Sequence, residues 1–338
     1  MAVRQVSVGR RRRRFSALVT AVLVAVALAL SGCGDVNDAE GGPGDTQGGE
    51  TKRIAFSFPF RAVDIYKPLI DAAKAEADEQ GYELLESSAG ISAAEQLAEV
   101  NTWIAQGVDA IVLFSLEPDS MAPVVDKAHE AGVEIIGYGE NIPGQDGSIV
   151  FDNEQGAELI GTVTGEYINE ELGGEAQIGV LSFLTGKQNR IRTENAVATI
   201  LESAPGAEVV AEAQANDAGA ALEVSRPMLA ANPDIDVLVA NTDDAVNGFQ
   251  AALGGRASDS FWFASYDAST PVLKKMLAGD LKGVTGYLPT EEIGRTVVSA
   301  AANAMTGEGP TGISPEYLAV TSDDHDFIQE ILAERRTG

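Results

Sequence analysis

Beyond residue 52 the chain alternates between two kinds of hydrophobic pattern. Short apolar runs rich in β-branched residues are separated by amphipathic segments of roughly 12 to 18 residues, a length that suits helices. The apolar runs predict strands at 53–58, 82–86, 110–115, 134–138, 148–151, 176–183, 208–213, 237–240, 261–266 and 283–287. Regular alternation of this kind is typical of β-α units and predicts an α/β fold with parallel sheets.

One intervening segment, 93–106, shows the helical period most clearly. Its apolar residues recur at spacings of three and four: Ala94, Leu97, Val100 and Ile104. Gly107 follows directly, and glycine commonly ends a helix because it adopts the left-handed conformation without strain. We therefore expect a helix over 93–106 that buries this apolar face.

The predicted strands fall into two successive groups of five, which indicates two similar Rossmann-like lobes. The length of 338 residues agrees with two domains, at roughly 100 to 200 residues each. In open parallel sheets, ligands bind beyond the carboxyl ends of the strands. Two such lobes therefore predict a ligand cleft between them.

The first 50 residues have a different character. Arginines cluster at 10–14, and an uncharged apolar run at 15–30 follows, shorter than the roughly 20 residues of a membrane span. We interpret 1–32 as a signal peptide. Arg12-Arg13 partly resembles a twin-arginine export signal, so the export route stays open. The polar stretch 33–51 has little to bury and is expected to be a flexible tether.

The junction between these segments carries the only cysteine of the chain. Leu30-Ser31-Gly32-Cys33 resembles the lipobox of bacterial lipoproteins, in which the cysteine receives lipid and the preceding segment is removed. The resemblance implies lipid attachment at Cys33. We therefore expect an exported protein that is anchored to the outer face of the cell membrane.

Composition and charge restrict the possible partners. The chain has 51 Asp and Glu against 23 Lys and Arg, a formal net charge of -28, and a normal apolar content of 45%. Binding to the phosphates of nucleic acids without regard to sequence requires a basic surface, so nucleic acid is excluded as a partner. The acidic balance is interpreted as a solvated surface.

Motifs for catalysis and for cofactors are absent from the sequence. We find no Gly-Lys-Ser/Thr phosphate loop, no Gly-x-Ser-x-Gly elbow and no calcium loop. The two histidines, His129 and His325, fall on surface positions, and the paired acids Asp243-Asp244 are interpreted as complements of a helix N-terminus. We therefore expect no cofactor, no metal and no enzymatic activity.

Several segments occur in the order in which a known family carries them. They are 106–113, 131–136, Asp152-Asn153, 190–192, 232–236, 241–244, Tyr266-Asp267 and Leu288-Pro289. Together, over about 53–310, they resemble the ribose-type periplasmic sugar-binding proteins of ABC importers, which have the type I periplasmic-binding-protein fold.

The resemblance implies two lobes joined by three crossovers, near Phe151, Tyr287 and Leu318. Lobe one then comprises 52–151 with 288–317, and lobe two comprises 152–287 with 318–338. It implies a solute-binding protein, expected to be a monomer, that captures one small polar ligand, a monosaccharide or polyol, and delivers it to an ABC permease. A receptor for a membrane sensor is the alternative, and a lactose-repressor-type regulator is opposed by the N-terminal leader.

The resemblance also carries a set of ligand-binding residues. Tyr66 matches an aromatic that stacks on the ligand, Arg190 matches an arginine that binds hydroxyl groups, and Asp267 matches an aspartate after an aromatic. The remaining expected ligand contacts are Asp64, Ser115, Asn216, Thr242 and Tyr287.

One position departs from the family pattern. Ribose-type members have Asp-Arg after the fourth strand, whereas this chain has Gly139-Glu140-Asn141. A cation is lost there and an acid remains, and Glu140 would share the pocket with Asp64 and Asp267. Unpaired carboxylates are costly to bury, so an amino sugar or another amine is the alternative ligand.

Overall fold

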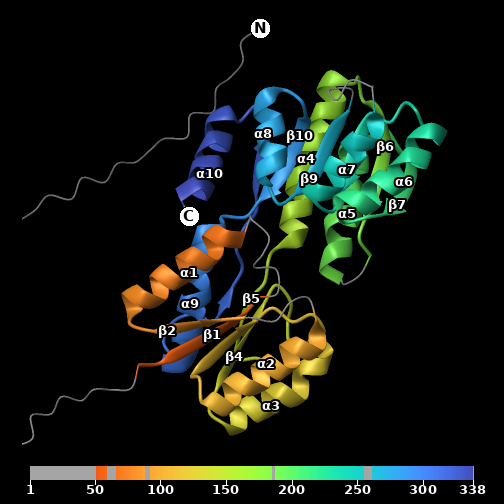
Figure 1. The fold of residues 1–338 in the computed structure, drawn as a ribbon. Helices are drawn as coiled ribbons and strands as arrows, with labels where there is room; N and C mark the ends of the chain where they lie inside the picture. Colours follow the sequence, from red (N-terminus) through yellow and green to blue (C-terminus); the bar gives the residue numbers. More distant parts are fainter. Residues whose placement is uncertain (1–50, 59–65, 88–91, 185–186, 255–260, 338) are drawn as a thin grey trace, which may run out of the picture. The chain divides into compact units, whose positions relative to one another are not determined.

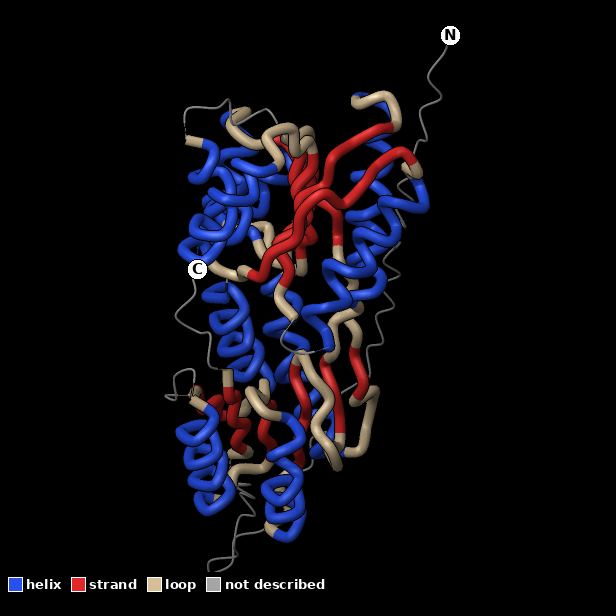
Figure 2. The backbone as a smooth tube through the Cα atoms, turned by 90° about the vertical axis from the view of Figure 1, so that its right-hand side faces the viewer, coloured by secondary structure: helices blue, strands red, loops and turns tan. Residues whose placement is uncertain are grey.

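A computed structural model describes residues 51–58, 66–87, 92–184, 187–254 and 261–337 (Figure 1, Figure 2). This part of the chain forms two α/β lobes, each a sheet with helices on both faces. The expected signal peptide, Cys33 and the tether up to residue 50 lie outside the described residues. None of the described helices is both long enough and apolar enough to cross a membrane.

The sheet of the first lobe has the strand order β11-β5-β4-β3-β1-β2, and its described strands are parallel. Its strands are β1 (Arg53–Ser57), β2 (Glu83–Glu86), β3 (Ala110–Leu113), β4 (Glu134–Tyr138), β5 (Gly147–Ile149) and β11 (Gly312–Ile313). Residues of β1, β3 and β4 are mostly fully buried, because helices cover both faces of the sheet.

The sheet of the second lobe has the order β12-β10-β9-β8-β6-β7. Its strands are β6 (Glu175–Ser182), β7 (Gly206–Gln214), β8 (Val237–Ala240), β9 (Trp262–Tyr266), β10 (Lys282–Tyr287) and β12 (Leu318–Thr321). These strands are parallel except β12, which runs antiparallel to β10. The ten predicted strands are confirmed, and β11 and β12 are additional.

The two sheets divide the core into four clusters, one on each face of each sheet, and helices cover each cluster. In the first lobe, α1 (Lys67–Gln80) and α9 (Thr290–Thr306) cover one face, and α2 (Ala93–Gln106) and α3 (Ala122–Glu130) cover the other, with the short 3-10 helix η2 (Pro118–Met121) before α3. In the second lobe, α4 (Asn153–Glu171) and α5 (Lys187–Ser203) cover one face. The opposite face carries α6 (Ala218–Ala231), α7 (Asp243–Leu253), α8 (Thr270–Ala278) and α10 (His325–Thr337).

The chain passes between the sheets three times, between β5 and α4, between β10 and α9, and between β11 and β12. The third passage is the least expected from the hydrophobic pattern. Strand β11 has two residues, and β12 is only partly buried, so neither produces a strong apolar run.

Helix α2 has the predicted bounds, and Val100 and Ile104 of the predicted face are buried, but the first half of that face is not. It ends at Gly107, which has φ 71° as expected of a left-handed cap, yet Ala94 and Leu97 are exposed. A polar residue, Gln96, is buried in their place, and its Nε2 donates to Ser57 Oγ (3.0 Å).

Further hydrogen bonds explain why Gln96 faces inward. Its Nε2 also donates to the carbonyl oxygen of Phe114 (2.6 Å), and its Oε1 accepts from the backbone N–H of Leu116 (3.2 Å). The Phe114 carbonyl and the Leu116 N–H belong to the loop that follows β3, whereas Ser57 is the last residue of β1. One amide thus ties the carboxyl ends of two strands together, which apolar periodicity alone does not reveal.

Close contact between α1 and α9 gives a stability prediction. A Cβ placed at Gly294 would lie 2.1 Å from the backbone oxygen of Leu69. We expect Gly294→Val to lower the free energy of unfolding by about 2 kcal/mol, because the helices must separate. Arg295→Val, at an exposed neighbour, should cost less than about 1 kcal/mol. Urea unfolding measures both, and equal losses would contradict the packing argument.

Candidate functional site

A cavity of about 650 Å³ lies at the carboxyl ends of the strands of both sheets. Phe58 follows β1, Phe114 follows β3 and Glu140 follows β4 on the first lobe. Asn241 follows β8 and Asp267 follows β9 on the second lobe. This is the edge at which parallel sheets place ligand sites, and a cavity thus lies where the sequence predicts the ligand cleft.

The first lobe contributes an aromatic wall, which we define as Phe58, Tyr66, Phe114, Tyr138 and Phe151. The ring centroid of Phe58 lies 4.8 Å from that of Tyr66, 5.6 Å from that of Tyr138 and 5.9 Å from that of Phe114. Phe151 packs edge-on against Tyr138 at 5.4 Å. The rings support one another at mostly perpendicular angles, which aromatic pairs favour.

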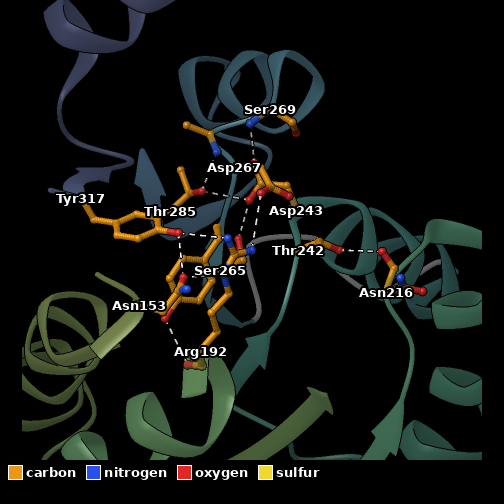
Figure 3. A network of polar contacts seen from close by, with 12 residues as sticks. Asn153, Arg192, Asn216, Thr242, Asp243, Ser265, Asp267, Ser269, Thr285 and Tyr317 are labelled. Carbon is orange, nitrogen blue, oxygen red and sulfur yellow. Dashed lines mark hydrogen bonds and ion pairs between the residues drawn. The ribbon is translucent and has the colours of Figure 1, made fainter. Parts of the chain in front are cut away.

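The second lobe contributes polar groups. Arg192 Nε donates to Asn153 Oδ1 (2.9 Å), and Arg192 Nη2 donates to Tyr317 Oη (2.9 Å). Tyr317 Oη in turn donates to Asn153 Oδ1 (2.8 Å) (Figure 3). Asn153 Nδ2 donates to Gln188 Oε1 (2.9 Å). The first two bonds restrict the guanidinium directly and the other two fix its acceptors, so Arg192 is a positioned donor.

The charge of Arg192 is balanced by its surroundings. Its Nη1 lies 3.9 Å from Asp267 Oδ1, and its guanidinium lies over the ring of Tyr266 at 4.9 Å from the centroid. Burial alone disfavours the charged form, but Tyr317 and Asp267 outweigh it and raise the pKa of Arg192. The side chain is only 17% exposed. Arg192 is therefore a permanent cation within the cavity.

Asp267 enters the cavity from a strained turn. It has φ 100°, and the next residue, Ala268, has φ 44°, values that non-glycine residues rarely adopt. The Ala268 N–H donates to Thr285 Oγ1 (3.0 Å), and the Ser269 N–H donates to Asp243 Oδ2 (2.5 Å). We call residues 267–269 the site turn. Strain of this kind persists only where surrounding bonds fix the backbone, and it is common at ligand sites.

Asp243 is the anchor of the site turn. It is fully buried, and its Oδ1 accepts from Thr285 Oγ1 (3.0 Å) and from Ser265 Oγ. Burial, together with the charge of Asp267, raises the pKa of Asp243 to about 7 although three hydrogen bonds oppose the rise. The side chain of Thr242 caps α7. Asp243 is therefore more than the complement of a helix N-terminus that the sequence predicts, because its carboxylate also binds the backbone of the site turn.

Two polar atoms at the cavity have no hydrogen-bond partner among the described residues. They are Asn241 Oδ1 and Ser269 Oγ, both buried, and both residues line the cavity. An unpaired buried polar atom costs about 1 to 3 kcal/mol. A ligand with hydroxyl groups could supply the missing partners.

Five of the expected ligand contacts line the cavity: Tyr66, Glu140, Asn216, Thr242 and Asp267. Thr242 Oγ1 also donates to the carbonyl oxygen of Asn216 (2.8 Å), which ties the ends of two strands (Figure 3). The structure thus brings residues from five separate loops to one place.

Three other expected contacts do not line the cavity. Arg190 is exposed on α5, two residues from Arg192, and residues two apart on a helix face different directions. Ser115 is buried and its Oγ accepts from the backbone N–H of Glu117 (3.2 Å). Tyr287 lies in the core, and its Oη donates to Glu334 Oε2 (3.4 Å). Asp64 lies outside the described residues.

Sequence reasoning missed Arg192 and Asn153 although both stand in the segments that carry the family resemblance. It also missed most of the aromatic wall, because its phenylalanines fall at the ends of the predicted strands 53–58, 110–115 and 148–151 and were treated as strand residues, whereas the observed strands end before them. Position at the carboxyl end of a predicted strand was the available signal. Across the described ranges, no group of three or more His, Cys, Asp or Glu could hold a metal ion.

Comparison with known sequences gives consistent results. A sequence profile of the family described as "periplasmic binding protein domain" matches residues 54–309. A xylitol-binding protein of Mycolicibacterium smegmatis is 25% identical over 320 residues, covering 92% of this chain and 87% of that protein. The ribose import binding protein of Escherichia coli K12 is 25% identical over 242 residues, covering 71% of this chain and 80% of that protein.

Solved structures share the fold. A solute-binding protein of an ABC transporter from Bacillus halodurans, with bound myo-inositol, has a TM-score of 0.72 and 26% identity, covering 84% of this chain and 98% of that chain. A periplasmic solute-binding protein from Actinobacillus succinogenes, with bound D-allose, has a TM-score of 0.74 and 21% identity, covering 82% of this chain and 100% of that chain.

Proposed function

Because the chain belongs to the periplasmic binding protein family, we propose that it binds one monosaccharide or polyol in the cavity and delivers it to an ABC permease. The observation that carries this proposal is the division of the cavity into an aromatic wall and a polar half. Sugars have both kinds of surface, since C–H groups gather on the faces of the ring and hydroxyl groups project from its edge.

The polar half fits adjacent hydroxyl groups. A guanidinium presents parallel N–H donors, and a carboxylate presents two acceptors, so Arg192 and Asp267 can bind neighbouring oxygens of one solute. Asn241 Oδ1 and Ser269 Oγ add groups that lack partners in the described chain. The volume of about 650 Å³ falls within the usual range of small-molecule sites.

The relatives support the same class of solute. Their names refer to xylitol and ribose, and the structural neighbours hold myo-inositol and D-allose. The protein in our proposal makes and breaks no bond: its described site offers hydrogen bonds and ring contacts for recognition. Delivery to a membrane sensor instead of a permease would use the same binding step.

Attachment to the membrane is part of the proposal. Lipid on Cys33 and the tether that follows would keep the binding body beside its permease at the outer face of the cell membrane. The lipobox-like sequence supports this placement. Mass spectrometry of the exported protein would test it, because lipidation would leave a mature chain that begins at modified Cys33.

Thermal melting of the purified protein against pentoses, hexoses, polyols, amino sugars and small amines tests the proposal. A solute at about 100 times its Kd should stabilise the folded state by about 2.7 kcal/mol. We expect the shift to be confined to one or a few related sugars or polyols. Shifts with amines alone would indicate a cationic solute instead of a sugar or polyol. The absence of a shift with any carbohydrate would contradict the proposal.

A cationic solute is the second candidate, because carboxylates outnumber cations around the cavity. Glu140, Asp244 and Asp267 line it, against one arginine, Arg192. An amine would pair with one of these carboxylates, which a neutral sugar can only meet through hydroxyl donors.

Glu140→Gln separates these candidates. For a neutral solute we expect affinity to fall about tenfold, because a charge-assisted hydrogen bond becomes a neutral one. For an amine the fall should reach about 100-fold or more, since an ion pair is lost. Glu117→Gln, at an exposed residue outside the cavity, is the matched control. Calorimetric titration measures both, and unchanged affinity would remove Glu140 from the site.

A further inference from the structure

A second cavity, of about 450 Å³, lies between α1, α8 and α10. Its lining includes three cations, Lys67, Lys274 and Arg335, and no acidic residue. The chain as a whole has more than twice as many acidic as basic residues. A cavity whose charged lining residues are all positive is therefore unusual for this protein and needs an explanation.

Arg335 is the most informative of these residues. Its Nη1 donates to the carbonyl oxygen of Ala268 (2.5 Å), and its guanidinium lies 6.0 Å from the ring centroid of Tyr287. Its Nε and Nη2 are buried and have no hydrogen-bond partner among the described residues. Two unpaired donors on a cation are costly, and an oxyanion would satisfy both, because guanidinium donors match a pair of oxygens.

The two lysines extend this positive surface. Lys274 is exposed on α8, and Lys67 forms an exposed pair with Asp71 (2.5 Å). Lys67 belongs to α1 of the first lobe, whereas Lys274 and Arg335 belong to helices of the second lobe. An ion bound here would therefore meet cations from both lobes.

We propose that this cavity, the α1-α8-α10 cavity, binds a phosphate group. A phosphate offers more oxygens than one arginine uses, so the lysines can bind the remainder. The site does not depend on the nature of the solute in the main cavity. It does lie beside that cavity, since Thr270 lines both and Arg335 holds the carbonyl of Ala268 within the site turn.

Melting of the purified protein with inorganic phosphate, against sodium chloride at equal ionic strength, tests the site. At ten times its Kd, phosphate should raise the Tm by about 2 to 3 °C. Arg335→Gln and Lys274→Gln should each remove at least half of this rise. Lys282→Gln removes the same charge at an exposed position outside the cavity and should retain it.

Lys274→Gln keeps the test decisive if Arg335→Gln unfolds, because the side chain of Lys274 is exposed. Glycerol 3-phosphate, a soluble form of a phospholipid headgroup, distinguishes the sources. A larger rise with this ester indicates a lipid or another phosphate ester, and an equal rise indicates the free ion; both support the site. No rise with either probe, or equal rises in wild type and all three variants, would overturn it.

Discussion

Arg192→Ala is expected to weaken binding of the cognate solute about 1,000-fold, or about 4 kcal/mol. The guanidinium is held by Asn153 and Tyr317 and faces Asp267, so its removal deletes a positioned donor and leaves the half-buried carboxylate of Asp267 without its cation. Calorimetric titration with the solute identified by melting would measure the loss.

Arg190→Ala is the matched control. It removes the same charge from the same helix, but Arg190 is exposed and does not line the cavity. We expect its affinity to remain within about twofold of wild type, as for other surface changes. If Arg190→Ala weakened binding as strongly as Arg192→Ala, the match suggested by the family resemblance would be right and our assignment of Arg192 would fail.

The second large effect concerns stability and pH. The pKa of Asp243 is about 7 in the folded protein, well above its ordinary value of 3.8, because burial favours its neutral form. The folded state therefore holds this proton more tightly than the unfolded state does. The resulting stabilisation is fully present below about pH 4 and is lost as the pH rises through 7. The loss of stabilisation between pH 5 and pH 8 amounts to about 3 kcal/mol.

Urea unfolding of wild type and Asp243→Asn at pH 5 and pH 8 would measure this linkage. We expect the wild type to lose about 3 kcal/mol more between these pH values than the variant does. The absolute stability of the variant should be lower, because its amide cannot accept from the Ser269 N–H at the position of Oδ2. The decisive quantity is therefore the change with pH.

Asp244→Asn serves as the control for Asp243→Asn, because it removes the neighbouring charge from the same helix turn. It should keep most of the pH dependence. Asp267, whose pKa is also raised, contributes to the slope in wild type and in both variants. Parallel slopes in wild type and Asp243→Asn would show that Asp243 does not hold a proton across this range.

Much of the fold was predictable because strands of a doubly covered sheet must be apolar on both faces. Runs such as Ala-Ile-Val-Leu in β3 are visible without any structure. Helix α2 shows the limit of the method: its bounds follow from periodicity and Gly107, but its buried face includes Gln96, whose partners are distant in sequence. Periodicity cannot identify a buried polar residue whose hydrogen bonds are long-range.

The site was predictable in outline and not in detail. Residues after strand ends, such as Asp267 and Thr242, could be found because parallel strands direct the following residue to one edge. The choice between Arg190 and Arg192 depends on the rotation of α5 about its axis, which a two-residue motif does not fix. Asp243 was missed because its role comes from burial beside the site turn, and burial is a tertiary property.

The order of elements along the chain has a consequence for biosynthesis. The first sheet receives its edge strand β11, and the face packed by α9, only after the whole strand series of the second lobe through β10 has been made. The second sheet receives its edge strand β12, which pairs with β10, only a few residues later. Neither lobe can be completed on the ribosome until translation is almost finished, since its last pairings are far apart in sequence. Until then both sheets expose an unpaired edge, at β5 in the first sheet and at β10 in the second, and exposed strand edges make a partly completed chain prone to aggregation.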